Sequence, residues 1–390
     1  MSLLIEESEA LHARVRAFAR QSLAGAAAES FDVLAADIAR YQAAHVDGFR
    51  RLVDASGSSL TDSTGIPAVP VDAFRLTRVA VHPKDLDVVR FVTSGTTSGA
   101  PGTHAMRSTE TYRELSLAWG VPALRCAAVT PRIVVALAPD PGPDIASSLA
   151  FMMRALMQTL DGRSLRDGDP AHFDSDAGER WLLGPDGPNL AGLERASAIA
   201  RERHEPLVVL STSFALVLLA DAREATFDAP EGSVVMTTGG FKGKTREIAP
   251  ETLEERVTAL FGVPAARIIG EYGMTELTSQ LYEGAPNARD VAPASAGSGL
   301  PFARGVFYPP PWLRVTPVDP VSLAPVEPGE TGIARFVDLG NVDSAVAIVA
   351  QDVIQQEGDG VRLLGRLTGA PARGCSLAIE EMVLGRREGT

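Results

Sequence analysis

Short apolar runs that alternate with helical patterns constrain the fold of this 390-residue chain more than any other feature. The runs lie at residues 133–137, 207–210, 234–237 and 267–270, and residues 251–261 between the last two have the spacing of an amphipathic helix. Strands that alternate with helices build α/β sheets. The sequence therefore predicts an α/β fold.

The segments on either side of this core differ from it in pattern. Residues 6–53 place apolar side chains at helical spacing among charged ones, which predicts amphipathic helices packed on the main body. After Gly299 the sequence becomes rich in proline and in short β-like runs. We expect a helical segment at 1–60, an α/β core at 61–300, a smaller β-rich subdomain at 301–366 and a short C-terminal segment at 367–390.

Composition excludes several classes of protein. The formal charge of −13 argues against a broad nucleic-acid surface, although a small basic pocket for an anionic cofactor remains compatible with it. An acidic N-terminus and the lack of a long apolar stretch predict a cytoplasmic protein without a membrane span. The only lysines are Lys84, Lys242 and Lys244, so the position of each is informative.

A hydroxyl-rich loop, Thr-Ser-Gly-Thr-Thr-Ser-Gly at 93–99, follows an apolar run at 86–92 that we expect to be a buried strand. Glycines let backbone N–H groups converge on an anion, and hydroxyls add neutral donors to phosphate oxygens. The candidate phosphate ligands are Ser94, Gly95, Thr96 and Thr97. The loop is not a Walker loop, because the spacing and lysine of that motif are missing. Taken alone, it is equally consistent with a flexible surface turn.

A glycine pair follows the apolar run at 234–237. Gly239 and Gly240 would let a planar base lie against the backbone, and Lys242 just beyond them could meet a phosphate or carboxylate. The alternative is an ordinary glycine turn with solvated basic residues.

A third segment, Gly-Glu-Tyr-Gly-Met-Thr-Glu at 270–276, again places a strand before a glycine turn. Tyr272 can stack on a base, Thr275 can donate to phosphate, and Glu276 is an oxygen ligand suited to Mg²⁺. The alternative is a strand-end turn with a helix-capping threonine.

A fourth segment is an expected hairpin that turns at 358–360. Asp352 and Arg366 at its strand ends could bind the two hydroxyls of a ribose. By themselves these two residues would be an exposed ion pair.

In this order and spacing, the four segments resemble the AMP-forming acyl-adenylating superfamily, over residues 92–366. Further strings resemble one branch of it, the LuxE-type acyl-protein synthetases, which activate fatty acids. They lie at 238–243, 272–276, 310–314, 328–332, 338–341 and 373–376. The resemblance implies a large domain of layered α/β sheets with a smaller β-rich subdomain, without the full mobile C-terminal domain of longer relatives.

The resemblance also implies a nucleotide site for ATP and Mg²⁺, at which a carboxylic acid, fatty or otherwise apolar, becomes acyl-AMP. Ser94, Thr96 and Thr97 would contact the β- and γ-phosphates, and Gly239 and Gly240 would border adenine. Tyr272, followed by Gly273, would stack on adenine. Thr275 would contact the α-phosphate, Glu276 would hold Mg²⁺, and Asp352 and Arg366 would bind ribose. We expect the acid to lie near Phe214, Gly239, Phe241 and Met274.

The sequence departs from longer relatives in its positive charge. The loop at 93–104 lacks the lysine that many relatives carry there, and no lysine follows Lys244. That charge normally assists the attack of a carboxylate oxygen on the α-phosphorus. We expect Mg²⁺ at Glu276, with Lys242 or Arg246, to supply it; a partner subunit is the alternative.

The two cysteines have different expected roles. Cys375 stands beside an arginine and a glycine that favour an accessible thiolate, and the resemblance implies that it carries the acyl group to a partner reductase or carrier protein. Coenzyme A or a carrier-protein pantetheine could instead accept the acyl group directly, and Cys375 could be a small packing residue.

Cys126 is expected in the core, and His104 is a possible loop hydrogen-bond donor. An inactive nucleotide-binding scaffold is the least favoured alternative.

Overall fold

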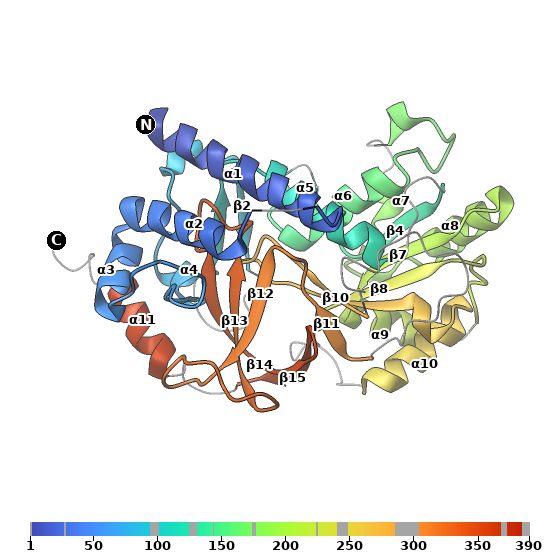
Figure 1. The fold of residues 1–390 in the computed structure, drawn as a ribbon. Helices are drawn as coiled ribbons and strands as arrows, with labels where there is room; N and C mark the ends of the chain where they lie inside the picture. Colours follow the sequence, from blue (N-terminus) through green and yellow to red (C-terminus); the bar gives the residue numbers. More distant parts are fainter. Residues whose placement is uncertain are drawn as a thin grey trace.

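In the computed structural model, a mixed sheet, to which the described residues contribute eleven strands, forms the centre of the protein (Figure 1). Its strand order is β12-β13-β14-β15-β11-β10-β9-β8-β7-β4, and β1 (Val69–Pro70) pairs with β14. The α/β fold predicted from the sequence is confirmed. The structure describes residues 2–26, 29–93, 101–124, 131–142, 144–173, 177–223, 225–239, 249–284, 304–367 and 373–383.

Four parallel strands make up one half of the sheet. They are β4 (Ile133–Leu137), β7 (Leu207–Thr212), β8 (Val234–Thr238) and β9 (Ile268–Tyr272). They are apolar almost throughout because helices cover both faces. Alternate residues face α5 (Glu110–Ala123) and α6 (Ser148–Leu160) on one side. The others face α8 (Leu190–Arg203), α9 (Ser213–Ala222) and α10 (Pro250–Phe261). Because the strands are parallel, their carboxyl ends lie at one edge.

The other half of the sheet is antiparallel. Its strands are β10 (Leu281–Glu283), β11 (Val306–Tyr308), β12 (Leu313–Val318), β13 (Thr331–Asp338), β14 (Ala347–Glu357) and β15 (Gly360–Arg366). β10 pairs with both β9 and β11, so the two halves are continuous. The predicted hairpin is β14–β15, and Gly358 takes the left-handed φ of +57° that its tight turn requires. The predicted domain boundary at residue 300 stays a prediction.

Helices at the two ends of the chain pack on each other. The expected N-terminal helices are α1 (Ser2–Leu23), α2 (Phe31–His45) and α3 (Asp47–Ser56). The last described helix, α11 (Arg373–Val383), lies against α3 (Figure 1). Gly48 permits this approach, because a Cβ there would lie 2.7 Å from the carbonyl oxygen of Met382.

The apolar run at 86–92 is not the buried strand that we expected. A short 3₁₀ helix (Lys84–Leu86) precedes β2 (Val89–Val92), which pairs only with β3 (Thr103–Met106) among the described residues. Arg90 and Val92 are exposed and Phe91 is buried, so the strand is covered on one face only.

The remaining short elements connect these layers. They are α4 (Ala73–Leu76), a 3₁₀ turn (Pro170–His172), α7 (Ala177–Arg180), β5 (Leu183–Gly184), β6 (Gly187–Pro188) and a 3₁₀ turn (Ala265–Arg267). Throughout the described ranges, every helix is too short or too polar to cross a membrane.

Candidate functional site

The structure places about half of the residues expected at the site. Those in the described ranges are Gly239, Tyr272, Gly273, Thr275, Glu276, Asp352, Arg366 and Cys375. Those outside the described ranges are Ser94, Gly95, Thr96, Thr97, Gly240, Phe241, Lys242, Arg246 and Cys126. The described residues therefore carry the base, ribose and metal parts of the prediction, and the triphosphate loop stays a prediction from sequence.

Gly239 and Tyr272 lie at neighbouring strand ends. Thr238, the last residue of β8, is opposite Glu271 of β9, so Gly239 and Tyr272, which follow them, lie at adjacent positions on the two strands. Gly239 has a φ of +71°, a left-handed conformation that glycine adopts without strain. Among the described residues, and apart from its chain neighbours, no heavy atom lies within 4 Å of a Cβ built at Gly239, so the backbone angle is the described feature that favours glycine there.

Tyr272 joins the two halves of the sheet. Its hydroxyl donates to Oδ2 of Asp352 at 3.2 Å, and its ring stacks on Phe336 with 6.1 Å between ring centroids. Three strands, β10, β11 and β15, lie between β9 and β14 in the sheet. The contact between Tyr272 and Asp352 therefore means that the sheet is curved and brings β9 close to β14. Burial, followed by the charge of Asp352, raises the pKa of Tyr272 well above its ordinary value, and the phenol stays a donor.

Asp352 and Arg366 are directly opposite each other on β14 and β15. A backbone hydrogen bond between the adjacent residues, from the N–H of Leu367 to the carbonyl of Gln351 at 2.8 Å, fixes this strand register. Asp352 is half-buried and Arg366 is exposed. The structure thus brings a carboxylate, a guanidinium and Tyr272 to one place, as the ribose prediction requires.

The main chain of Thr275 and Glu276 is held by two buried side chains. Nδ1 of His104 lies 2.8 Å from the carbonyl oxygen of Thr275, and Nδ2 of Asn341 donates to the carbonyl of Glu276 at 2.9 Å. His104 donates this bond, since a carbonyl oxygen can only accept; it does so from strand β3 and to the 275–276 segment, whereas we expected a donor in the loop. Asp338 fixes the following turn, because its Oδ2 accepts the backbone N–H of Thr278 and of Ser279, both at 2.9 Å.

Sequence reasoning missed a buried carboxyl beside this segment. Glu271 is buried and accepts a short hydrogen bond from the hydroxyl of Thr238. Burial raises the pKa of Glu271 to about 7. Gly273 gives this carboxyl room, because a Cβ at residue 273 would lie 2.8 Å from Oε1 of Glu271. Its position directly before Tyr272 was the only signal that could have drawn attention to Glu271.

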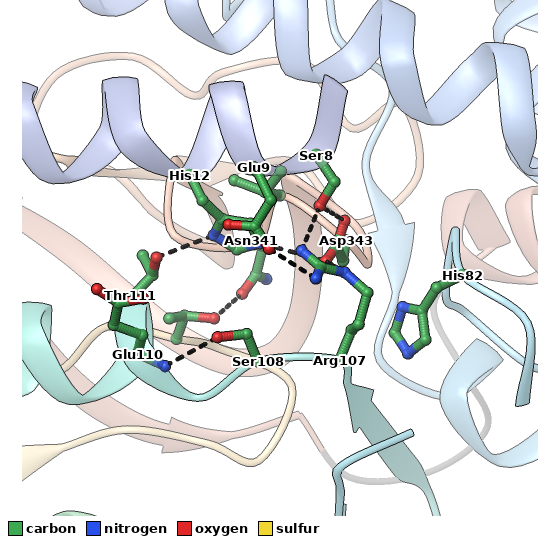
Figure 2. Close-up of polar contacts among 12 residues, drawn as sticks. Ser8, Glu9, His12, His82, Arg107, Ser108, Glu110, Thr111, Asn341 and Asp343 are labelled. Carbon is green, nitrogen blue, oxygen red and sulfur yellow. Dashed lines mark hydrogen bonds and ion pairs between the residues drawn. The ribbon is translucent and has the colours of Figure 1, made fainter. Parts of the chain in front are cut away.

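A polar cluster ties the turn that carries Asn341 to the N-terminal helices (Figure 2). Asp343 accepts from the hydroxyl of Ser8 at 2.6 Å and lies 3.2 Å from Nε2 of His12. Nε of Arg107 lies 3.5 Å from the same carboxylate. The cavity beside the cluster has a volume of about 20 Å³, which is room for a single water molecule. We therefore interpret the cluster as structural support for the turn.

The expected acid-pocket residues lie at the same edge of the sheet. Phe214 is the second residue of α9, which directly follows β7; Gly239 follows β8, and Met274 lies just beyond the end of β9. Phe214 and Met274 are half-buried. Next to Phe214, the Ser213 hydroxyl pairs with the Thr237 hydroxyl at 2.9 Å, which ties α9 to β8.

The expectation of an accessible thiolate at Cys375 is wrong. Cys375 is 2% exposed in α11, which packs against α3, α4 and β1. Burial, followed by the negative charge of Asp72, raises the pKa of the Cys375 thiol to about 11. The sequence pattern did not reveal this burial, which arises from helix packing. A role for Cys375 as acyl carrier stays a prediction.

Comparison with known proteins supports the fold through structure rather than sequence. No protein-family model and no curated protein matches the chain. The open conformation of a 2-hydroxyisobutyryl-CoA ligase, in complex with 2-HIB-AMP and CoA, matches with a TM-score of 0.53 and 12% identity, over 85% of this chain and 73% of that one. The same ligase in its postadenylation state matches with a TM-score of 0.54 and 12% identity, over 93% and 68%.

A third structure, ATP-bound MatB from Rhodopseudomonas palustris, has a TM-score of 0.44 and 14% identity, and this chain spans 49% of its length. That likeness is too weak to support an argument. The two ligase matches establish the fold alone, because their identity is so low. The fold is the one that these two ligase structures share with this chain over 85% and 93% of its length.

Proposed function

We propose that this protein activates a carboxylic acid with ATP, releasing pyrophosphate, and transfers the acyl group from acyl-AMP to a thiol. The observation that carries the proposal is the 3.2 Å hydrogen bond between Tyr272 and Asp352. It joins the residue expected to stack on adenine to a residue expected to bind ribose, although 80 positions separate them in the chain. The fold of the acyl-adenylating enzymes supports the same conclusion.

The nucleoside would bind at the carboxyl ends of β8 and β9, beside Asp352 of β14, which Tyr272 contacts. Gly239 and Gly240 would border the adenine, with Tyr272 against its face. The Asp352 carboxylate would accept hydrogen bonds from the ribose hydroxyls, with the Arg366 guanidinium opposite it in the strand register.

The phosphates would extend toward Thr275 and Glu276, with Ser94, Gly95, Thr96 and Thr97 at the β- and γ-phosphates. Among the described residues, no three His, Cys, Asp or Glu side chains cluster as a complete metal site. Mg²⁺ is commonly held by one or two carboxylates together with substrate phosphates, and Glu276 supplies a buried carboxylate in this segment. Glu276 would be the protein ligand, and the ion would neutralise charge on the phosphates. Lys242 or Arg246 would add the second positive charge.

The proposed chemistry has two balanced steps. One oxygen of the carboxylate attacks the α-phosphorus of ATP, the bond to the bridging oxygen breaks, and pyrophosphate leaves. The thiol sulfur then attacks the acyl carbon, AMP leaves, and the thiol proton passes to solvent. The acid is already ionised at neutral pH, so the first step needs orientation and positive charge rather than a general base.

The acceptor that we propose is an external thiol, either coenzyme A or a carrier-protein pantetheine. The burial of Cys375 and its raised pKa favour this acceptor over an acyl-enzyme, because a thiol reacts as its thiolate. The half-buried apolar side chains of Phe214 and Met274 suggest that the acid has an apolar body. A partner reductase remains compatible with this scheme as the next acyl acceptor.

The test is acid-dependent ATP–pyrophosphate exchange with a panel of fatty, aryl and amino acids. We expect one class of acid to support exchange that requires Mg²⁺, and the variant Asp352→Asn to lose at least about tenfold in kcat/KM for ATP, since hydrogen bonds to a charged group contribute about 1.5–3 kcal/mol. Coenzyme A and a pantetheinylated carrier protein, supplied separately to the active mixture, would identify the acceptor by thioester formation. Exchange with none of the acids would contradict the proposal.

A further inference from the structure

Two buried side chains bind consecutive carbonyl groups of the segment that would contact the phosphates and the metal. His104 reaches the carbonyl of Thr275 at 2.8 Å, and Asn341 reaches the carbonyl of Glu276 at 2.9 Å. Both are almost fully buried, with exposed fractions of 2% and 1%. Two such donors on adjacent carbonyls fix the path of the main chain, and therefore the directions of the Thr275 and Glu276 side chains.

The hydrogen bond from His104 to the Thr275 carbonyl does not depend on pH near neutrality. The Thr275 carbonyl can only accept, so Nδ1 of His104 carries the hydrogen. Burial lowers the pKa of His104 to about 4, which leaves the imidazole neutral at neutral pH. The ring of Phe74 packs edge-on against the imidazole with 5.8 Å between centroids, and this contact restricts rotation of His104.

His104 also lies close to the base of the predicted phosphate loop. The N–H of Thr93 donates to the carbonyl of Gly102 at 3.0 Å, and the N–H of Gly102 donates to the Thr93 hydroxyl at 2.8 Å. These two bonds close the chain on either side of residues 94–100. Gly102 directly precedes β3, the strand that carries His104 and its contact with Thr275.

Asn341 makes the corresponding link from the antiparallel half of the sheet. Besides the bond to Glu276, its Nδ2 donates to the carbonyl of Ala345 at 2.9 Å, and its Oδ1 accepts from the Thr278 hydroxyl at 2.5 Å. Gly340 allows this close approach, because a Cβ there would lie 2.8 Å from the side chain of Thr278.

We propose that His104 and Asn341 are positioning residues for the adenylation step, which hold the main chain of Thr275 and Glu276 in a fixed relation to β3 and to the turn after β13. This inference rests on the function proposed above. Neither residue is expected to touch the nucleotide, the metal or the acid; each acts through a backbone carbonyl. A small displacement of phosphate-contacting groups is costly, since misplacement by about 1 Å can lower a rate about 100-fold.

The test compares His104→Leu, which removes the donor, with His104→Asn, whose amide nitrogen can take the place of Nδ1. His82→Asn is the matched control, because His82 is equally buried but lies 3.0 Å from Asp87 instead of binding the 275–276 segment. The measurements are kcat and KM for ATP in acid-dependent pyrophosphate exchange, the Mg²⁺ concentration for half-maximal rate, and calorimetric affinities for MgATP and adenosine.

We expect His104→Leu to lower kcat by at least about tenfold and to raise the half-saturating Mg²⁺ concentration, with adenosine affinity changed less than about twofold. His104→Asn should recover most of the loss, and His82→Asn should match the parent in both quantities. A folded His104→Leu variant with parental kcat and Mg²⁺ dependence would overturn the proposal. Equal losses of MgATP and adenosine affinity would also overturn it, because they would indicate general disruption.

A second variant guards against misfolding of His104→Leu. Asn341→Asp keeps an acceptor for Thr278 but loses the donor to Glu276, and we expect the same rise in Mg²⁺ requirement. Parental Mg²⁺ dependence in Asn341→Asp would contradict the proposal. If the parent binds MgATP but exchanges with no acid, the proposed function fails, while the MgATP affinity of these variants still tests the positioning role.

Discussion

Replacement of Asp343 by asparagine should reduce stability in a pH-dependent way. The Asp343 carboxylate receives hydrogen bonds from Ser8 of α1 and Tyr41 of α2. It also lies against His12 and Arg107, and Figure 2 shows both of them beside it. The asparagine side chain would have nearly the same shape but no charge, and its amide nitrogen would face groups that are themselves donors. The N-terminal helices would lose the charged part of their attachment to the turn that follows β13, while the hydrogen bonds of Gln42 to that turn would remain.

The size of the effect follows from the pKa of Asp343. Burial alone would raise this pKa, but the hydrogen bond and charge of His12, followed by Ser8 and Arg107, outweigh burial and lower it from an ordinary 3.8 to about 2. At about 1.36 kcal/mol per pH unit, this difference stabilises the folded state by about 2 kcal/mol. Because the pKa is lower in the folded state, the stabilisation is present above pH 3.8 and is lost as pH falls toward 2.

Urea unfolding at pH 5 and pH 3, followed by circular dichroism, measures the size of the stability loss and its dependence on pH. At pH 5 we expect Asp343→Asn to lower the free energy of unfolding by about 2 kcal/mol. By pH 3 the difference from the parent should shrink by about 1 kcal/mol, because part of the parent's advantage has been titrated away. A difference that stays constant between the two pH values, or a variant as stable as the parent at pH 5, would refute the reasoning.

Three other substitutions test neighbouring parts of the account. Tyr272→Phe removes the donor to Asp352, so KM for ATP in pyrophosphate exchange should rise about fivefold or more, and an unchanged KM would count against the proposed nucleoside site. Gly273→Ala places a Cβ 2.8 Å from Glu271, so urea unfolding should show a loss of about 1–3 kcal/mol, whereas parental stability would mean that the carboxyl moves aside freely. Cys375→Ser should keep parental exchange and parental thioester formation with an external thiol, and a hydroxylamine-labile acyl-protein seen only in the parent would restore Cys375 as acyl carrier.

Local patterns predicted the parts of the fold that local chemistry determines. The apolar runs became β4, β7, β8 and β9, because strands covered on both faces must be apolar throughout. The glycine at residue 358 and the spacing around it predicted the β14–β15 hairpin for a similarly local reason. The order of the four segments also indicated that Tyr272 and Asp352 belong to one site.

Features that depend on packing between distant segments could not be predicted. Cys375 looked accessible beside an arginine and a glycine, yet α11 buries it against α3. His104 could be recognised as a donor, but its acceptor lies 171 residues away at Thr275. Glu271 lies in a strand that is otherwise apolar, and nothing in its immediate sequence shows that Thr238 would be its partner.

The central claim is that a carboxylate oxygen attacks the α-phosphorus of ATP. Once exchange has identified an acid, the reaction can be run to thioester with that acid labelled with ¹⁸O in its carboxyl group. Mass spectrometry of the products then shows where the label goes. The account predicts one ¹⁸O atom in AMP and none in pyrophosphate, because the bond formed to phosphorus stays with AMP when the thiol attacks. Label in inorganic phosphate, or AMP without label, would contradict it.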